Sequence, residues 1–207
     1  SRKKVLVFDP VVGGEALLVL DIGEYVRMLA VFEEPATGAV RLACGSGDWH
    51  DGKVHIFDAV AGGDALLVLD VGSGIKALLA FEDLATGALR LASGSQDGRL
   101  RVFDPLAGGD ALVVLEGHGY KVNALTAFTD PTTDEPRLVS ADGDNVRVWN
   151  PAASGAAIEA EPEGHSEEVS ALVTFVDPAA GVMRVATGSH DKTIRVRDAE
   201  TGDGLLV

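Results

Sequence analysis

Residues 94–104 read GSQDGRLRVFD, and residues 188–198 read GSHDKTIRVRD. Each stretch joins a turn of Gly, Ser and Asp to a short apolar run that ends in an aspartate. Related endings occur at residues 5–9 (VLVFD), 53–58 (KVHIFD) and 146–150 (VRVWN). The last-but-one residues of these endings stand at positions 8, 57, 103, 149 and 197, so successive copies are 46 to 49 residues apart. A fixed period of this length predicts a fold made of repeated units, with four copies in the chain.

Two further series keep step with the first. One reads GEALLVL at 14–20, GDALLVL at 63–69 and GDALVVL at 109–115, with a truncated GDGLLV at 202–207. The other begins at an arginine in each period. Within a period the apolar runs are short, rich in Val and Leu, and separated by turn residues, which predicts strands rather than helices. Four linked strands form a small antiparallel sheet, and neighbouring copies must cover its faces.

The sequence resembles the WD40 family of β-propellers over nearly its whole length. The residues that carry the resemblance are the pairs Gly117-His118 and Gly164-His165, the turns at 94–97 and 188–191, and the strand-ending dipeptides at the Trp-Asp place. The resemblance implies an all-β propeller in which each repeat supplies the outer strand of one blade and three inner strands of the next. It also implies structural roles for His118, His165, Trp149, Asp97 and Asp191.

We expect one WD40-like domain or propeller segment over residues 1–207. The expected repeats are 15–63, 64–109, 110–155 and 156–202, with an outer strand at 4–9 and an inner strand at 204–207. This count gives four complete four-stranded blades plus one extra, unpaired strand at each end. Three explanations stay open: an excerpt of a larger ring, a ring completed by another copy or another protein, and a four-bladed ring with two surplus strands.

The copies depart from the family pattern. The Trp-Asp place holds Phe-Asp three times, then Trp149-Asn150 and Arg197-Asp198, and the first two copies lack the Gly-His pair. The third and fourth copies carry Ala124 and Ala171 where the family has a serine or threonine. We therefore expect the hydrogen-bonded His/Ser/Asp/Trp network to be incomplete in every copy, and the first two copies to have lower local stability.

Composition excludes several classes of protein. With 17 basic and 32 acidic residues the net charge is −15, which argues against nucleic-acid binding. Cys44 is the only cysteine, and the asparagines form no glycosylation sequon, so we expect an intracellular, cytoplasmic protein. The longest apolar runs are too short for membrane insertion. We expect no catalytic residues, cofactor or metal site, since Ser189-His190-Asp191 and Asp142-Gly143-Asp144-Asn145 are interpreted as turns.

Repeating charges mark the candidate partner-binding surface. Each link between the second and third strands of a repeat is acidic, and each is followed by an arginine, so the propeller geometry predicts an acidic face with a circle of arginines. Two interpretations are open: local ion pairs on a solvated face, or docking of a basic or mixed-charge protein. Trp49, in an extra turn of the first copy on the opposite face, is a candidate anchor. The candidates are Glu33, Glu34, Arg41, Glu82, Asp83, Arg90, Asp130, Arg137, Asp177, Arg184 and Trp49.

The sequence favours a non-catalytic protein–protein interaction scaffold that uses its loop faces. One alternative is a structural subunit built into a larger assembly through its unpaired terminal strands. Another is a ligand-binding propeller. Protein partners are expected in the first two cases, with a homo-oligomer or ring completion by another chain as the form of assembly.

Overall fold

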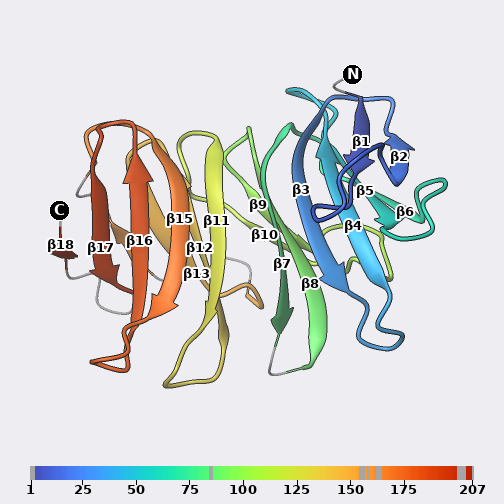
Figure 1. Ribbon diagram of the computed structural model, residues 1–207. Coiled ribbons are helices and arrows are strands. Elements are labelled where there is room, and N and C mark those ends of the chain that lie inside the picture. Colours follow the sequence, from blue (N-terminus) through green and yellow to red (C-terminus); the bar gives the residue numbers. More distant parts are fainter. Residues whose placement is uncertain are drawn as a thin grey trace.

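The computed structural model describes residues 3–83, 86–153, 157, 159–161, 165–199 and 204–206, with the backbone alone for 159–161 and 204–206. The strands within these ranges number eighteen, and none of the described residues is helical (Figure 1). The prediction of an all-β fold is therefore confirmed.

Sixteen of the strands form four antiparallel sheets, called here blades 1 to 4, and within each blade the strands pair in chain order. Blade 1 contains β3 (Val26–Glu33), β4 (Val40–Ser46), β5 (Lys53–Asp58) and β6 (Leu67–Asp70). Blade 2 contains β7 (Ile75–Asp83), β8 (Ala88–Ser95), β9 (Leu100–Phe103) and β10 (Val113–Leu115). Blade 3 contains β11 (Val122–Thr129), β12 (Pro136–Asp142), β13 (Asn145–Trp149) and β14 (Glu159–Glu161). Blade 4 contains β15 (Val169–Val176), β16 (Met183–Ser189), β17 (Ile194–Asp198) and β18 (Gly204–Leu206).

The two remaining strands, β1 (Lys4–Val7) and β2 (Leu18–Asp21), pair with each other as a hairpin. The prediction of one unpaired strand at each end is wrong, because β18 pairs with β17 as the outermost strand of blade 4. Segments such as Leu67–Asp70 are linked by turns to the strands on both sides. The turns alone therefore do not decide with which of the two neighbouring strands such a segment pairs. In the structure Leu67–Asp70 pairs back onto β5 and completes the preceding blade.

The blades stack through their first strands, β3 against β7, β7 against β11 and β11 against β15. Apolar residues point alternately to the two faces of each sheet, so every inner blade contributes to two cores. In blade 2, Leu91 and Phe103 pack toward blade 1, whereas Ala92 and Leu100 pack toward blade 3. The β1–β2 hairpin covers the other side of blade 1 through Val5 and Leu20, among other residues.

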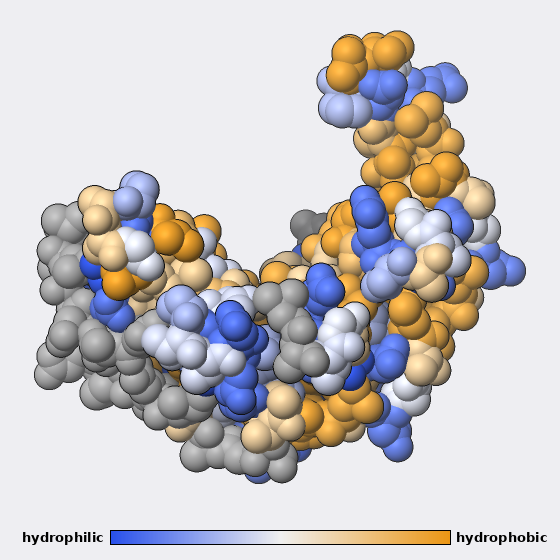
Figure 2. Space-filling model, turned by 90° about the horizontal axis from the view of Figure 1, so that it is seen from below, coloured by the Kyte–Doolittle hydropathy of each residue, from blue (hydrophilic) through white to orange (hydrophobic). Residues whose placement is uncertain are grey.

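The blades form an open arc around a hollow lined by the first strands (Figure 2). The hairpin projects at one end of the arc and blade 4 stands at the other, with a wide gap between them. At the blade 4 end, Ile194 is 68% exposed, although Leu100 at the matching register position of blade 2 is fully buried. Val173 and Phe175 are also exposed. Blade 4 therefore presents an interblade face without a covering sheet among the described residues.

Candidate functional site

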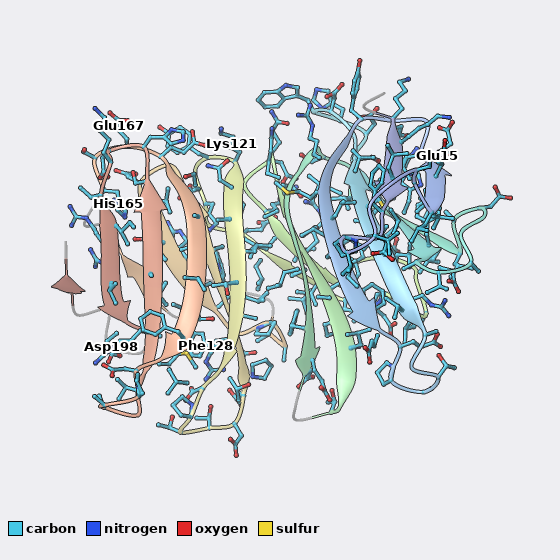
Figure 3. All side chains as sticks on the ribbon, viewed as in Figure 1. Glu15, Lys121, Phe128, His165, Glu167 and Asp198 are labelled. Atoms are coloured by element: carbon cyan, nitrogen blue, oxygen red, sulfur yellow. The ribbon has the colours of Figure 1, made fainter. Side chains whose placement is uncertain are left out.

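The predicted arginines lie near the start of the second strand of every blade. This is the side of the molecule that is lower in Figure 1. We call this the arginine end, and it holds Arg41, Arg90, Arg137 and Arg184. Arg41 bridges two acids of its own blade, with its guanidinium 2.7 Å from Glu34 and 2.7 Å from Asp58. Arg184 does the same with Asp198 at 2.6 Å and Asp177 at 3.5 Å. Asp198 is labelled at this end in Figure 3.

Arg137 forms the most enclosed pair of this set. Its side chain is 12% exposed and lies 2.9 Å from Asp130 and 2.8 Å from Glu135. The Thr132 hydroxyl donates a 2.6 Å hydrogen bond to Asp130, and with other hydrogen bonds and the Arg137 charge it lowers the pKa of this carboxyl to about 2. Asp130 therefore stays ionised and organises its own loop at neutral pH.

Arg90 is the exception, because its nearest carboxylate, Asp104, is 3.7 Å away. It lines a cleft of about 200 Å³ between blades 2 and 3, together with Phe81, Val102 and Pro136. The neighbouring Asp83 accepts a 2.7 Å hydrogen bond from the Thr86 hydroxyl.

The arginine end thus brings most of the predicted residues together as ion pairs within single blades. The strand-ending aspartates, Asp58 and Asp198, take part as second partners of the arginines, which the sequence patterns did not indicate. Glu33 and Glu82 differ from the other acids because they are exposed at the ends of β3 and β7. Figure 2 looks onto this end and shows hydrophilic residues on several of its loops.

Exposed aromatic side chains gather at the opposite end, where β3, β7, β11 and β15 begin. We call it the aromatic end, and Lys121 marks it in Figure 3. Tyr25 is 47% exposed, Trp49 64% and Tyr120 69%. Trp49 was predicted as an anchor, whereas Tyr25 and Tyr120 were missed. Tyr25 directly precedes β3, and Tyr120 lies two residues before β11. This position, just ahead of the first strand of a blade, is the signal that could have found them.

The loop that carries Trp49 is held against blade 2 by close backbone contacts. A side chain at Gly52 would meet the carbonyl oxygen of Ser73, and one at Gly74 would meet the carbonyl oxygen of Asp48. Only glycine allows these approaches without a shift of the backbone. The loop is therefore a fixed part of the aromatic end, and it places Asp48 and Trp49 beside the start of β7.

In blade 3 all four members of the polar network, His118, Ser140, Asp142 and Trp149, lie within contact distance, so the prediction that the network is incomplete in every copy is wrong. His118 lies 2.5 Å from the hydroxyl of Ser140 and 2.9 Å from Asp142, and the indole of Trp149 donates a 2.7 Å hydrogen bond to Ser140. Burial raises the pKa of Asp142, but hydrogen bonds from His118 and two backbone amides outweigh it and lower the pKa overall. The serine lies on β12, one strand later than the position assigned from the sequence.

Blade 4 keeps part of this network. His165 lies 2.7 Å from the hydroxyl of Thr187 and 2.9 Å from Asp191. A hydrogen bond from Thr193, followed by the bond to His165, holds the pKa of Asp191 well below its usual range despite partial burial. Asp191 therefore pairs with His165 of the same blade, and the Ser189-His190-Asp191 stretch is a turn.

Blades 1 and 2 replace the network by apolar contacts. Ile22, Cys44 and Phe57 pack together in blade 1. In blade 2, Val71 and Phe103 share a core, and the buried hydroxyl of Ser93 has no hydrogen-bond partner among the residues that the structure describes. Asp97 binds Arg101 at 2.7 Å instead of a histidine. In these two blades apolar packing takes the place of the polar network.

The part of the chain that the structure describes contains neither a cluster of metal ligands nor a membrane-spanning helix. No group of three or more His, Cys, Asp or Glu side chains has an arrangement that would hold a metal ion there. No described segment forms a helix of the length and hydrophobicity needed to cross a membrane.

The fold and the repeated turns define a β-propeller, and comparison with known proteins specifies the type. The model of the WD40 repeat, described as WD domain, G-beta repeat, matches residues 109–150 and 158–198. Among solved structures, a chain of the "Crystal Structure of Mitotic Checkpoint Complex" is similar with a TM-score of 0.73 and 21% sequence identity, over 98% of this chain and 58% of that chain. The present chain thus spans little more than half the length of that relative. The resemblance to WD40-repeat propellers is confirmed.

The similarity to known proteins identifies the fold and not a particular function. No curated protein sequence matches the chain. In contrast, 483 chains of solved structures match it, so the fold alone does not single out one function. WD40 propellers are generally non-catalytic and serve as scaffolds for protein interactions.

Proposed function

We propose that this protein is a non-catalytic scaffold for protein–protein interaction, acting in the cytoplasm. The observation that supports this most is the set of exposed aromatic side chains, Tyr25, Trp49 and Tyr120, at the aromatic end. Paired strands hold the loops in place, and loops on a rigid framework commonly carry binding residues. Exposed Trp and Tyr side chains contribute large contact areas at protein interfaces.

The acidic residues of the arginine end form a second candidate docking surface for a basic partner. Because Arg41, Arg137 and Arg184 pair with most of the nearby acids, the negative charge available to a partner includes the exposed Glu33 and Glu82. These two residues are exposed in the last two positions of β3 and β7, and neither pairs with Arg41, so their charge can be reversed without breaking the ion pairs of Arg41.

Affinity capture with loop variants tests the scaffold proposal. The full chain serves as bait in a lysate of the source cell, beside the variants Trp49→Ala/Tyr120→Ala and Glu33→Lys/Glu82→Lys. We expect the first variant to lose captured proteins, and thermal melting should show that both variants stay folded. If both capture the same proteins as the original chain in equal amounts, the loop ends do not dock partners and the proposal fails.

Permanent assembly into a larger structure is a second candidate, favoured by the exposed face of blade 4. Val173, Phe175 and Ile194 occupy positions whose counterparts in blade 2, Leu79, Phe81 and Leu100, pack against the next blade. An apolar face of this kind is a common site of association. Another copy of the chain or another protein could complete the arc there.

Light scattering on the isolated chain tests the self-association form of this candidate. Self-association through blade 4 predicts an oligomer that the variant Val173→Asp/Ile194→Asp converts to a monomer. A monomeric, stably folded original chain would contradict self-association, and only assembly with another protein would remain.

A further inference from the structure

A pocket of about 450 Å³ opens at the aromatic end between blades 1 and 2. Its walls come from the first residues of β3 and β7 and from the loop after β4. Tyr25, Arg27, Asp48 and Lys76 supply its polar lining, and Val26, Met28 and Ile75 the apolar lining. Arg27 and Lys76 are the second residues of β3 and β7, so neighbouring blades present a cation at the same height.

The charges around this pocket do not balance. The charged groups that most affect the pKa of the Lys76 amine include two cations, Arg27 and Lys121, and two carboxylates, Asp48 and Glu168. Both carboxylates are already engaged, Asp48 with Arg27 at 2.8 Å and Glu168 with Lys121 at 2.9 Å. Lys76 is therefore the third cation beside two neutralised pairs, in a chain whose net charge is −15.

Lys76 has no hydrogen bond or ion pair with the described residues, and its side chain is partly buried. Partial burial, followed by repulsion from Arg27 and Lys121, lowers the pKa of its amine. An anion placed in the pocket would offset the repulsion from Arg27 and Lys121. The position of Lys76 thus favours binding of a negatively charged group.

The surroundings of the pocket favour a protein segment over a small free anion. Tyr25 lines the pocket and is about half exposed, and Trp49 follows Asp48 in the loop that forms one wall. Aromatic side chains beside a charged pocket offer apolar contact to residues that flank an acidic side chain. An inorganic ion would leave that surface uncovered.

We propose that this pocket binds an aspartate or glutamate side chain within an acidic segment of a partner protein. Lys76 pairs with the carboxylate, and Tyr25 and Trp49 contact the residues beside it. This inference rests on the proposed scaffold function and names the chemistry of one partner. It also assigns docking of an acidic partner to the aromatic end, where the sequence offered only Trp49 as an anchor, whereas the repeating charges pointed to a basic or mixed-charge partner at the arginine end.

Titration of the full chain with acetylated hexaglutamate peptide tests the proposal. The emission of Trp49 reports binding, since the other tryptophan, Trp149, is fully buried. At about 50 mM salt, where screening is weak, hexaglutamate should shift this emission saturably and hexaglutamine should not. Lys76→Gln should weaken binding by about tenfold, the effect of losing one charge-assisted hydrogen bond. Lys192→Gln removes an exposed lysine elsewhere and should change it less than about twofold.

Three outcomes would overturn the inference. The first is the absence of hexaglutamate binding, and the second is equal binding by the Lys76→Gln and Lys192→Gln variants. The third is equally tight binding of inorganic phosphate with the same response at Trp49, which would make the pocket a site for free anions. If capture still depends on Trp49 and Tyr120 in any of these cases, the scaffold function stands and only the acidic-segment assignment fails.

Discussion

The indole nitrogen of Trp149 donates a 2.7 Å hydrogen bond to the hydroxyl of Ser140, and both side chains are fully buried. The same hydroxyl lies 2.5 Å from the imidazole of His118, whose other nitrogen faces Asp142. The Ser140 hydroxyl thus links β12 to β13 and to the loop before β11. In blade 2 the corresponding hydroxyl, that of Ser93, is buried and has no partner within the described part of the chain, which gives a matched internal comparison.

Removal of the two hydroxyls should change the free energy of unfolding by different amounts. Ser140→Ala leaves Trp149 and His118 without their buried partner and should lower the free energy of unfolding by about 1–3 kcal/mol. Ser93→Ala removes an unsatisfied buried group and should change it by less than about 0.5 kcal/mol, or raise it. Urea unfolding of both variants measures the difference. Equal losses would contradict the assigned network.

Blade 1 should open before blade 3, because it lacks the polar network. Cys44 is the only cysteine and is fully buried, and burial raises the pKa of its thiol to about 12. A thiol reagent should therefore react with the native chain only through local opening. With increasing urea, labelling of Cys44 should precede the change in Trp149 emission. Labelling that coincides with this change would show that the blades unfold together.

The bridging arginines should stabilise the fold more than exposed arginines do. Arg137→Ala should lower the free energy of unfolding by about 1–2 kcal/mol, since it strips two charge-assisted hydrogen bonds from a side chain that is largely enclosed. Arg99→Ala, which removes an exposed ion pair with Glu116, should cost less than about 0.5 kcal/mol. Similar values for the two variants would mean that the enclosed pair adds nothing.

Acid should destabilise the protein through Asp130. The pKa of this carboxyl is about 2 in the folded chain, against an ordinary value of 3.8. A carboxyl whose pKa is lowered by folding adds stability above its unfolded pKa, and this is lost as the pH falls toward the folded value. Stability should therefore drop between about pH 4 and pH 2, and the drop should be shallower in Asp130→Asn. Asp144→Asn controls for the change in net charge, and an unchanged slope in Asp130→Asn would contradict the assignment.

The sequence predicts the four sheets well because the period and the turns are local features. Segments such as Leu67–Asp70 show where this local information ends, since pairing with β5 or with β7 is decided by packing between blades. Ser140 was missed for a related reason: its role depends on which strand faces His118 and Trp149. Lys76 carries no motif at all, and only the packing of blades 1, 2 and 3 brings it near Arg27 and Lys121.

The arrangement of charge at the arginine end was also beyond the sequence. The pattern of acids followed by arginines predicts a charged face, but the partners of Arg41 and Arg184 include Asp58 and Asp198 from a different strand. Antiparallel pairing of β4 with β5 sets Arg41 directly opposite Asp58. Most of the charge is therefore used within the blades.

The central claim is that partners dock at the aromatic end. Site-specific photo-crosslinking tests this claim most directly. A photoreactive phenylalanine analogue replaces Trp49 in one sample and Glu33, at the arginine end, in another. Illumination in a lysate of the source cell should crosslink a protein partner from position 49 and not from position 33. Crosslinks from position 33 alone, or from neither position, would contradict docking at the aromatic end.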